Sequence, residues 1–128
     1  MGVVTAMGGI ESISAVTLAV SDMARSLAFY QAMGFNRVYG SERASFCSLQ
    51  AGEQYLNLST EESGFGGGWG RVIFYVADVD AVYRNLCDQG LIAAFPPRDA
   101  SWGERYFHIT DPDGHELSFA RPLKPLHR

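Results

Sequence analysis

One stretch decides the fold of this chain: Trp102-Gly103-Glu104-Arg105-Tyr106-Phe107-His108-Ile109-Thr110-Asp111-Pro112-Asp113-Gly114-His115-Glu116-Leu117-Ser118-Phe119. Two runs of alternating residues flank Asp-Pro-Asp-Gly, whose proline and glycine are typical of a tight turn. With residues 111–114 as the loop of a β-hairpin, the pairing puts Phe107 opposite Ser118. Side chains alternate between the faces of a strand, so one face is predicted to carry Arg105, Phe107, Ile109, Glu116 and Ser118, and the other Tyr106, His108, Leu117 and Phe119.

Length and composition limit the classes of protein that fit. A chain of 128 residues with 47% hydrophobic and 19% charged residues is typical of one globular domain. The net charge of −4, without a Lys/Arg cluster, argues against nucleic-acid binding. No apolar run reaches the roughly 20 residues that cross a membrane. The two cysteines have neither metal-site nor disulfide spacing, so we expect a cytoplasmic protein.

A β-α-β-β-β pattern occurs twice. In the first copy, residues 13–20 predict a strand, residues from 23 a helix with Ser21 as N-cap and Gly34 as terminator, and residues 35–39, 44–49 and 54–58 three strands. In the second copy, residues 71–76 predict a strand, the segment between Asp78 and Gly90 a helix, residues 91–95 a strand, and the hairpin completes the set. Adding 56 to Val16, Val20, Asp22 and Gly34 gives, without a gap, Val72, Val76, Asp78 and Gly90.

One copy has too few elements to bury a sheet, so the two copies must pair. The predicted class is α+β: two tandem βαβββ modules that form a curved mixed sheet around a concave cavity, with the helices outside. The predicted boundaries are a disordered leader at 1–11, module 1 at 12–59, a Gly-rich linker at 60–69, module 2 at 70–121 and a tail at 122–128, with 12–121 as one domain. The linker glycines are interpreted as a connector rather than a phosphate loop, because no Gly-Lys-Ser/Thr follows them.

The chain resembles the vicinal oxygen chelate superfamily, which includes glyoxalase I and the bleomycin-resistance proteins. The resemblance covers residues 12–121 and rests on Leu18-Ala19-Val20-Ser21-Asp22-Met23-Ala24-Arg25-Ser26-Leu27-Ala28-Phe29-Tyr30, on Met33-Gly34-Phe35, and on Trp102-Gly103 through the hairpin. It implies the fold above and a homodimer. In the family's metal enzymes, it also implies a divalent ion held by His, Gln or Glu at four strand positions.

Those four positions fall at Ala15, Asn57, Arg71 and Ser118 of this sequence. Alanine has no donor atom, arginine is a permanent cation, and asparagine and serine are weak oxygen donors. We therefore expect no metal and no other cofactor, and without the metal the family's usual mechanism is lost.

The histidines and cysteines are interpreted as structural. His108 is expected to face the helices, His115 lies at the turn, and His127 lies in the tail. Cys47 alternates with Phe46 and Ser48, so it should face the helices, and Cys87 belongs to a helical stripe. Buried and inert thiols are the expectation for both.

Strand alternation predicts which side chains line the cavity. The residues expected to bind a ligand are Phe46, Ser48, Tyr55, Asn57, Trp69, Arg71, Ile73, Trp102, Arg105, Phe107, Glu116 and Ser118. An aromatic lining with few polar groups is typical of a small-molecule site. Two alternatives stay open: the aromatic side chains fill one another's space as core, or the arginines form a structural pair with Glu116.

These residues favour a metal-free protein that sequesters a small organic ligand, aromatic or carboxylate-bearing, such as an antibiotic or a metabolite. The alternative is an enzyme of the same superfamily, a lyase, isomerase or dioxygenase, in which an arginine stabilises an oxyanion and Glu116 or Tyr55 moves a proton. Glu116 is the one residue that we name as a candidate for catalysis. A third alternative is an interaction module without a small ligand.

Overall fold

A computed structural model describes residues 9–61 and 68–124 of the chain. The first module contains β1 (Ala15–Ala19), α1 (Met23–Ala32), β2 (Asn36–Tyr39), β3 (Phe46–Ala51) and β4 (Gln54–Ser59). The second contains β5 (Arg71–Tyr75), α2 (Val79–Asp88), β6 (Arg98–Asp99), β7 (Glu104–Thr110) and β8 (Glu116–Pro122). The predicted α+β class of two tandem modules is confirmed. The predicted leader, linker and tail lie largely or partly outside the described residues.

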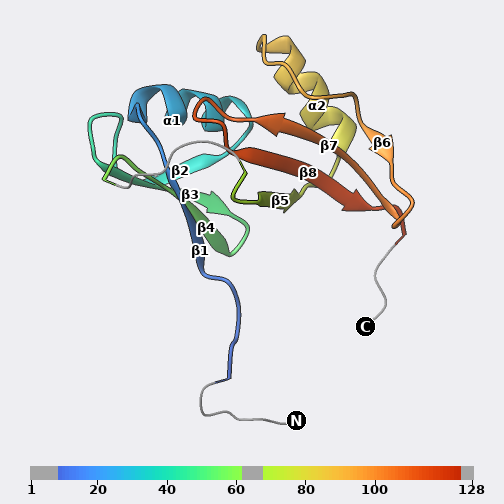
Figure 1. Cartoon of the computed structure of the whole chain (residues 1–128), viewed down its shortest axis with the longest axis horizontal. Coiled ribbons are helices and arrows are strands. Elements are labelled where there is room, and N and C mark those ends of the chain that lie inside the picture. Colours follow the sequence, from blue (N-terminus) through green and yellow to red (C-terminus); the bar gives the residue numbers. More distant parts are fainter. Residues whose placement is uncertain (1–8, 62–67, 125–128) are drawn as a thin grey trace.

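The strands form two four-stranded mixed sheets with the same topology. The order is β1-β4-β3-β2 in the first sheet and β5-β8-β7-β6 in the second, with β1 parallel to β4 and β5 parallel to β8. α1 packs against β4, and α2 packs against β7 and β8, so each helix covers its own sheet. Figure 1 shows the two halves side by side. In the described part of the chain, neither helix could cross a membrane.

The 56-residue repeat is confirmed down to the ends of the helices. Asp22 and Asp78 are the N-caps, with φ of −144° and −146°, and their carboxylates accept the backbone N–H of Arg25 and Ala81. The prediction that Ser21 is the N-cap is therefore wrong. Gly34 and Gly90 follow the two helices with φ of +106° and +79°, a conformation that favours glycine and ends a helix.

Residues 91–95 do not form the predicted strand. The alternation that suggested a strand is real, because Leu91, Ala93 and Phe95 all pack against the core. However, the segment forms one backbone bond to the neighbouring strand, from Ala94 N to the His108 carbonyl at 2.8 Å. The paired strand in this position is β6, which comes after Pro96-Pro97 and is two residues long.

The register of the β7–β8 hairpin differs by one residue from the prediction. Thr110 pairs with Glu116, because the turn contains His115 as well as residues 111–114. Asp111 closes this longer turn: its Oδ1 accepts the N–H groups of Asp113 and His115, both at 2.9 Å. A one-residue change of register moves every side chain of a strand to the other face. Phe107 and Ile109 therefore share a face with Leu117 and Phe119, under α2.

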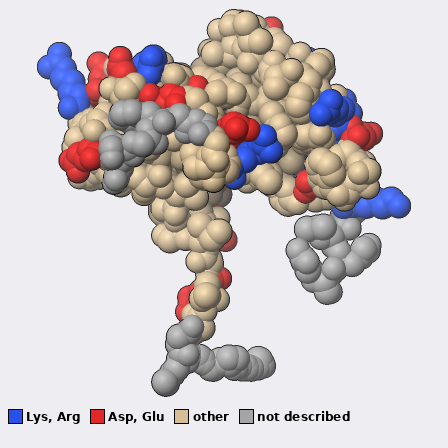
Figure 2. Space-filling model, viewed as in Figure 1, with Lys and Arg blue, Asp and Glu red and all other residues tan. Residues whose placement is uncertain are grey.

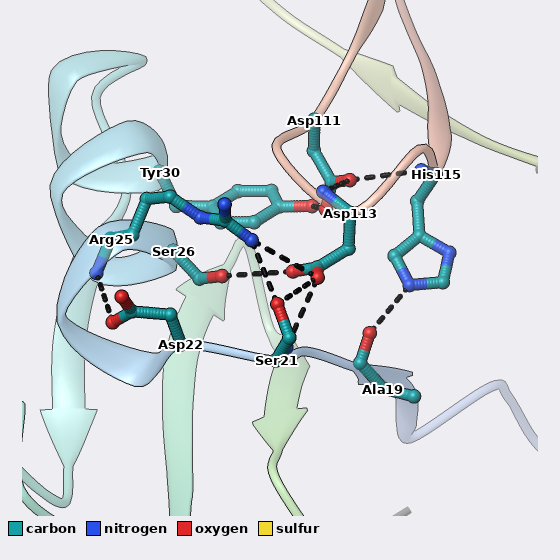
Figure 3. A network of polar contacts seen from close by, with 9 residues as sticks. All are labelled: Ala19, Ser21, Asp22, Arg25, Ser26, Tyr30, Asp111, Asp113 and His115. Atoms are coloured by element: carbon teal, nitrogen blue, oxygen red, sulfur yellow. Dashed lines mark hydrogen bonds and ion pairs between the residues drawn. The ribbon is translucent and has the colours of Figure 1, made fainter. Parts of the chain in front are cut away.

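The same turn fastens the second module to the start of α1 (Figure 3). Asp113 accepts hydrogen bonds from the Ser21 backbone at 3.1 Å, from the Ser21 hydroxyl at 2.6 Å and from the Ser26 hydroxyl at 3.3 Å. The Arg25 guanidinium pairs with the same carboxylate at 3.2 Å. These contacts join residues 87 to 92 positions apart, so they fix the modules against each other.

His115 forms a second link between the modules. It is 3% exposed, and its Nε2 lies 2.7 Å from the Ala19 carbonyl at the end of β1. The Trp69 indole N–H donates to His115 Nδ1 at 2.8 Å. An indole is only a donor, so Nδ1 is unprotonated and Nε2 carries the proton. His115 thus has the structural role predicted for it.

Candidate functional site

Each sheet has one face under its helix and an opposite face that we call the open face. In the first module, strand pairing puts Phe46, Ser48, Tyr55 and Asn57 on the open face, as predicted, together with Thr17. A polar chain crosses three strands there: the Ser48 hydroxyl donates to Asn57 Oδ1 at 2.7 Å, and Asn57 Nδ2 donates to the Thr17 hydroxyl at 3.3 Å. Tyr55, two residues before Asn57 on β4, is 40% exposed.

In the second module, Arg71, Ile73, Glu116 and Ser118 lie on the open face, as predicted. Arg71 and Glu116 form an ion pair of 2.6 Å between Nη2 and Oε1. This pair is the structural alternative left open by the sequence, so the Arg71 charge is balanced within the protein. Ile73 is 60% exposed, an unusual exposure for a side chain of its size in the middle of a strand.

Arg105 and Phe107 do not lie on the open face, so the prediction of their placement is wrong. Phe107 is fully buried and packs edge-on against Tyr83 of α2. Arg105 pairs with Asp80 of α2 at 2.9 Å and with Asp99 at 3.0 Å. These contacts hold the pKa of the Asp80 carboxyl below its usual range. The hairpin register is the cause of both errors.

The same register brings Tyr106 and His108 to the open face, and His108 was expected on the other side. Their rings lie 5.1 Å apart, and Trp102 lies 5.2 Å from Tyr106. Trp102 is 65% exposed, and its indole N–H donates to Glu104, which also accepts the Tyr75 hydroxyl. The open face of the second module therefore carries a continuous aromatic surface.

His108 has the electrostatic properties of a neutral base. Burial lowers the pKa of its imidazole below the ordinary value, and the positive charge of Arg71 lowers it further. Glu116 acts in the opposite direction but does not cancel these effects. The imidazole is therefore unprotonated near neutral pH and can accept a proton or a hydrogen bond. The alternation of the sequence gave no signal for this role, because it depends on the register.

A cavity of about 610 Å³ lies between the two modules. Its lining comes from β1, the exit of α1, the β3–β4 turn, β4 and β5, and is mostly apolar. The lining residues used below are Ala15, Met33, Phe35, Tyr55, Ile73 and Tyr75. Three of them, Tyr55, Ile73 and Tyr75, are 40–60% exposed and connect the cavity to the open faces. This volume lies within the range of small-molecule sites.

The four positions that correspond to the family's metal ligands do not fit a metal ion. Ala15 supplies no donor, and the Arg71 cation is paired with Glu116. Asn57 is engaged with Ser48 and Thr17, and the Ser118 hydroxyl lies 3.4 Å from the Phe107 carbonyl. Among the residues that the structure describes, no group of three or more His, Cys, Asp or Glu side chains could hold a metal.

The two cysteines differ from each other. Cys47 is fully buried, as predicted, and its burial raises the pKa of the thiol above its ordinary value. Cys87 is exposed, so the expectation that it is buried is wrong. Both are free thiols.

Charges of both signs are interspersed on the surface in Figure 2, with large uncharged areas between them.

Fold and site together define a protein of two βαβββ modules with a ligand-sized cavity at their junction. The model of the glyoxalase/bleomycin resistance protein/dioxygenase superfamily matches residues 12–119. The chain belongs to this superfamily.

Solved structures with the same fold are varied. TioX from Micromonospora sp. ML1 is 26% identical with a TM-score of 0.72, over 88% of this chain and 100% of that chain. A superfamily member from Sphaerobacter thermophilus is 23% identical with a TM-score of 0.70, over 87% and 97%. A lactoylglutathione lyase from Agrobacterium tumefaciens is 18% identical with a TM-score of 0.71, over 87% and 93%.

Among curated proteins, an uncharacterized protein of Mycobacterium bovis is 33% identical over 51 residues. An uncharacterized protein of Mycobacterium tuberculosis matches with the same identity over the same length. The match covers 40% of this chain and about a third of each relative, 34% and 30%.

Proposed function

We propose that this chain binds and sequesters a small organic molecule, aromatic or carboxylate-bearing, as a metal-free member of its superfamily. An antibiotic or a metabolite has the required size. The observation that carries the proposal is the cavity of about 610 Å³ between the modules, which continues onto the open faces at Tyr55, Ile73 and Tyr75. A protein that fills its own interior has no such space, because protein cores are closely packed.

The chemistry of the lining supports an aromatic ligand. Met33 and Phe35 supply apolar surface inside the cavity, and Tyr55 and Tyr75 supply ring faces at its opening. A flat ligand gains both buried apolar area and ring stacking from such walls. Arg71 and Arg105 do not support the carboxylate, because each is already paired with acidic side chains.

We propose a homodimer in which a second copy packs on the open faces and closes the binding site around the ligand. Tyr39, Tyr55, Ile73, Tyr75 and Trp102 are all at least 40% exposed on or beside these faces. Contiguous exposed apolar surface of this kind is typical of an interface or a ligand site. Sedimentation velocity tests the proposal: the native protein should be dimeric, and Ile73→Asp should be monomeric. A native protein that stays monomeric when its concentration is raised 100-fold would contradict the proposal.

An enzyme is the second candidate, and His108 is the observation that favours it. Its imidazole is neutral because of burial and of Arg71, and Glu116 is the nearby acid that the sequence already suggested. An imidazole that is unprotonated at neutral pH is available to accept a proton from a substrate. In this interpretation, Arg71 would have to exchange its Glu116 partner for a developing negative charge on the substrate. The two free thiols suit a reducing, cytoplasmic environment in either case.

One experiment separates the two candidates. The protein is purified from its native source, bound compounds are identified by mass spectrometry, and each is then incubated with fresh protein before product analysis. The binding function predicts stoichiometric release of an unchanged aromatic compound. Turnover that His108→Gln or Glu116→Gln abolishes would establish the enzyme instead.

A further inference from the structure

Of the two arginines on the open face of the second sheet, only Arg98 lacks an acidic partner in the described part of the chain. Arg98 pairs with Tyr106 across β6 and β7, and Tyr106 lies on the open face, so Arg98 lies there too. Arg71, the other one, is balanced by Glu116. No described carboxylate lies within 4 Å of Arg98, whereas Arg25, Arg71 and Arg105 all have one.

Two aromatic rings hold the Arg98 guanidinium in place. Its central carbon lies 3.7 Å from the centre of the Phe95 ring and 5.5 Å from that of Tyr106. Its Nε donates to the Tyr106 hydroxyl at 3.2 Å. The two Nη nitrogens form no hydrogen bond with any described residue, so a pair of donors on a positioned plane is left for a ligand. Such a plane matches the two oxygens of a carboxylate.

Trp102 supplies a stacking surface beside the same tyrosine. Its ring lies 5.2 Å from that of Tyr106 at an angle of 41°, and 65% of the residue is exposed. The Tyr106 side chain is thus flanked by an aromatic plane and by an unpaired cation. Tyr106 itself is only 8% exposed, so a flat ring on Trp102 would extend its carboxylate to the Nη groups of Arg98.

We propose that Arg98 and Trp102 are the two ends of a binding site for an aromatic carboxylate, with Tyr106 between them. This inference rests on the proposed function and narrows its ligand class to aromatic acids. One arginine without a described acidic partner on this open face suits a carboxylate with one negative charge. Glu104 forms no ion pair with Arg98; its carboxylate accepts hydrogen bonds from the Trp102 indole and the Tyr75 hydroxyl instead.

The test uses two probes of the same shape, naphthalene-2-carboxylate and naphthalene-2-carboxamide, in isothermal titration calorimetry at pH 7.5. The native protein should bind the acid at least about tenfold more tightly than the amide, as expected for a hydrogen bond to a charged group. Arg98→Gln should abolish this preference without weakening the amide, and Arg98→Lys should restore part of it. Arg84→Gln removes a charge from α2 and should keep the full preference.

Three results would overturn the inference. An acid preference that survives in Arg98→Gln assigns the carboxylate to another residue. Equal affinity of the native protein for both probes would contradict the preference for a carboxylate, but it would not contradict the proposed binding function. Absence of binding by both probes contradicts the proposed function itself, and the inference falls with it.

Discussion

The Tyr30 hydroxyl on α1 donates a 2.6 Å hydrogen bond to Oδ2 of Asp111 in the β7–β8 turn. The two residues belong to different modules, and both are buried. Burial raises the pKa of Tyr30 above its ordinary value, and the negative charge of Asp111 raises it further. The phenol therefore stays protonated as a donor, and Asp111 uses its other oxygen to set the hairpin register.

Tyr30→Phe should destabilise the protein by about 1.5–3 kcal/mol, because a buried hydrogen bond to a charged group is lost. The measurement is the free energy of unfolding from chemical denaturation. Tyr39→Phe is the matched control: Tyr39 is 65% exposed, and the structure records no hydrogen bond for its hydroxyl with a described residue, so its loss should change little. Equal effects of the two substitutions would show that the Tyr30–Asp111 bond does not hold the modules together.

His108 should make the stability of the protein depend on pH. Its pKa is lower in the folded protein than its ordinary value, so the unfolded chain binds the proton more readily. The free energy of unfolding should therefore fall as the pH drops through about 6.5, the ordinary pKa of histidine, and level off below the folded pKa. His108→Gln should flatten this part of the profile. An unchanged profile in the variant would assign the slope to other groups.

Arg105→Gln should lower the unfolding midpoint and leave ligand affinity unchanged. The guanidinium joins β7 to Asp80 of α2 and to Asp99 of β6, and it does not face the cavity. The ion pairs are partly exposed, so the loss should be small. Asp80→Asn should lower the unfolding midpoint by a similar amount. The double variant should lower it by less than the sum of the two single effects. Weaker binding of an aromatic probe by Arg105→Gln would contradict the placement of Arg105.

The sequence predicted the tandem modules and both helices, because turn and cap chemistry is local, although it put the first N-cap at Ser21 instead of Asp22. It did not predict the open face of β7. Both sets of alternating residues in that strand contain aromatic side chains, so hydrophobicity could not choose between them. The choice depends on Asp111 accepting two backbone N–H groups, which a linear pattern does not reveal. For the same reason, the predicted site included Arg105 and Phe107 and lacked Tyr106 and His108.

Trp102→Ala should weaken the binding of naphthalene-2-carboxamide severalfold. An aromatic contact contributes about 0.5–1.5 kcal/mol beyond the area that it buries, and the Trp102 ring is exposed beside Tyr106. The neutral probe isolates stacking from charge. Ile92→Ala, which removes another exposed apolar side chain, is the control and should keep the native affinity. A native-like affinity in the Trp102 variant would remove it from the site.

The central claim is that a small aromatic molecule binds at the junction of the modules and on the open faces next to it. Backbone amide NMR shifts during a titration with naphthalene-2-carboxylate test this claim most directly, because they locate the probe. The account predicts saturable shifts at Tyr55, Ile73 and Tyr75 around the cavity and at Arg98, Trp102 and Tyr106 on the adjoining open face. Exposed α2 positions such as Arg84 should change little. Shifts confined to the helix surfaces, or none at millimolar probe, would contradict it.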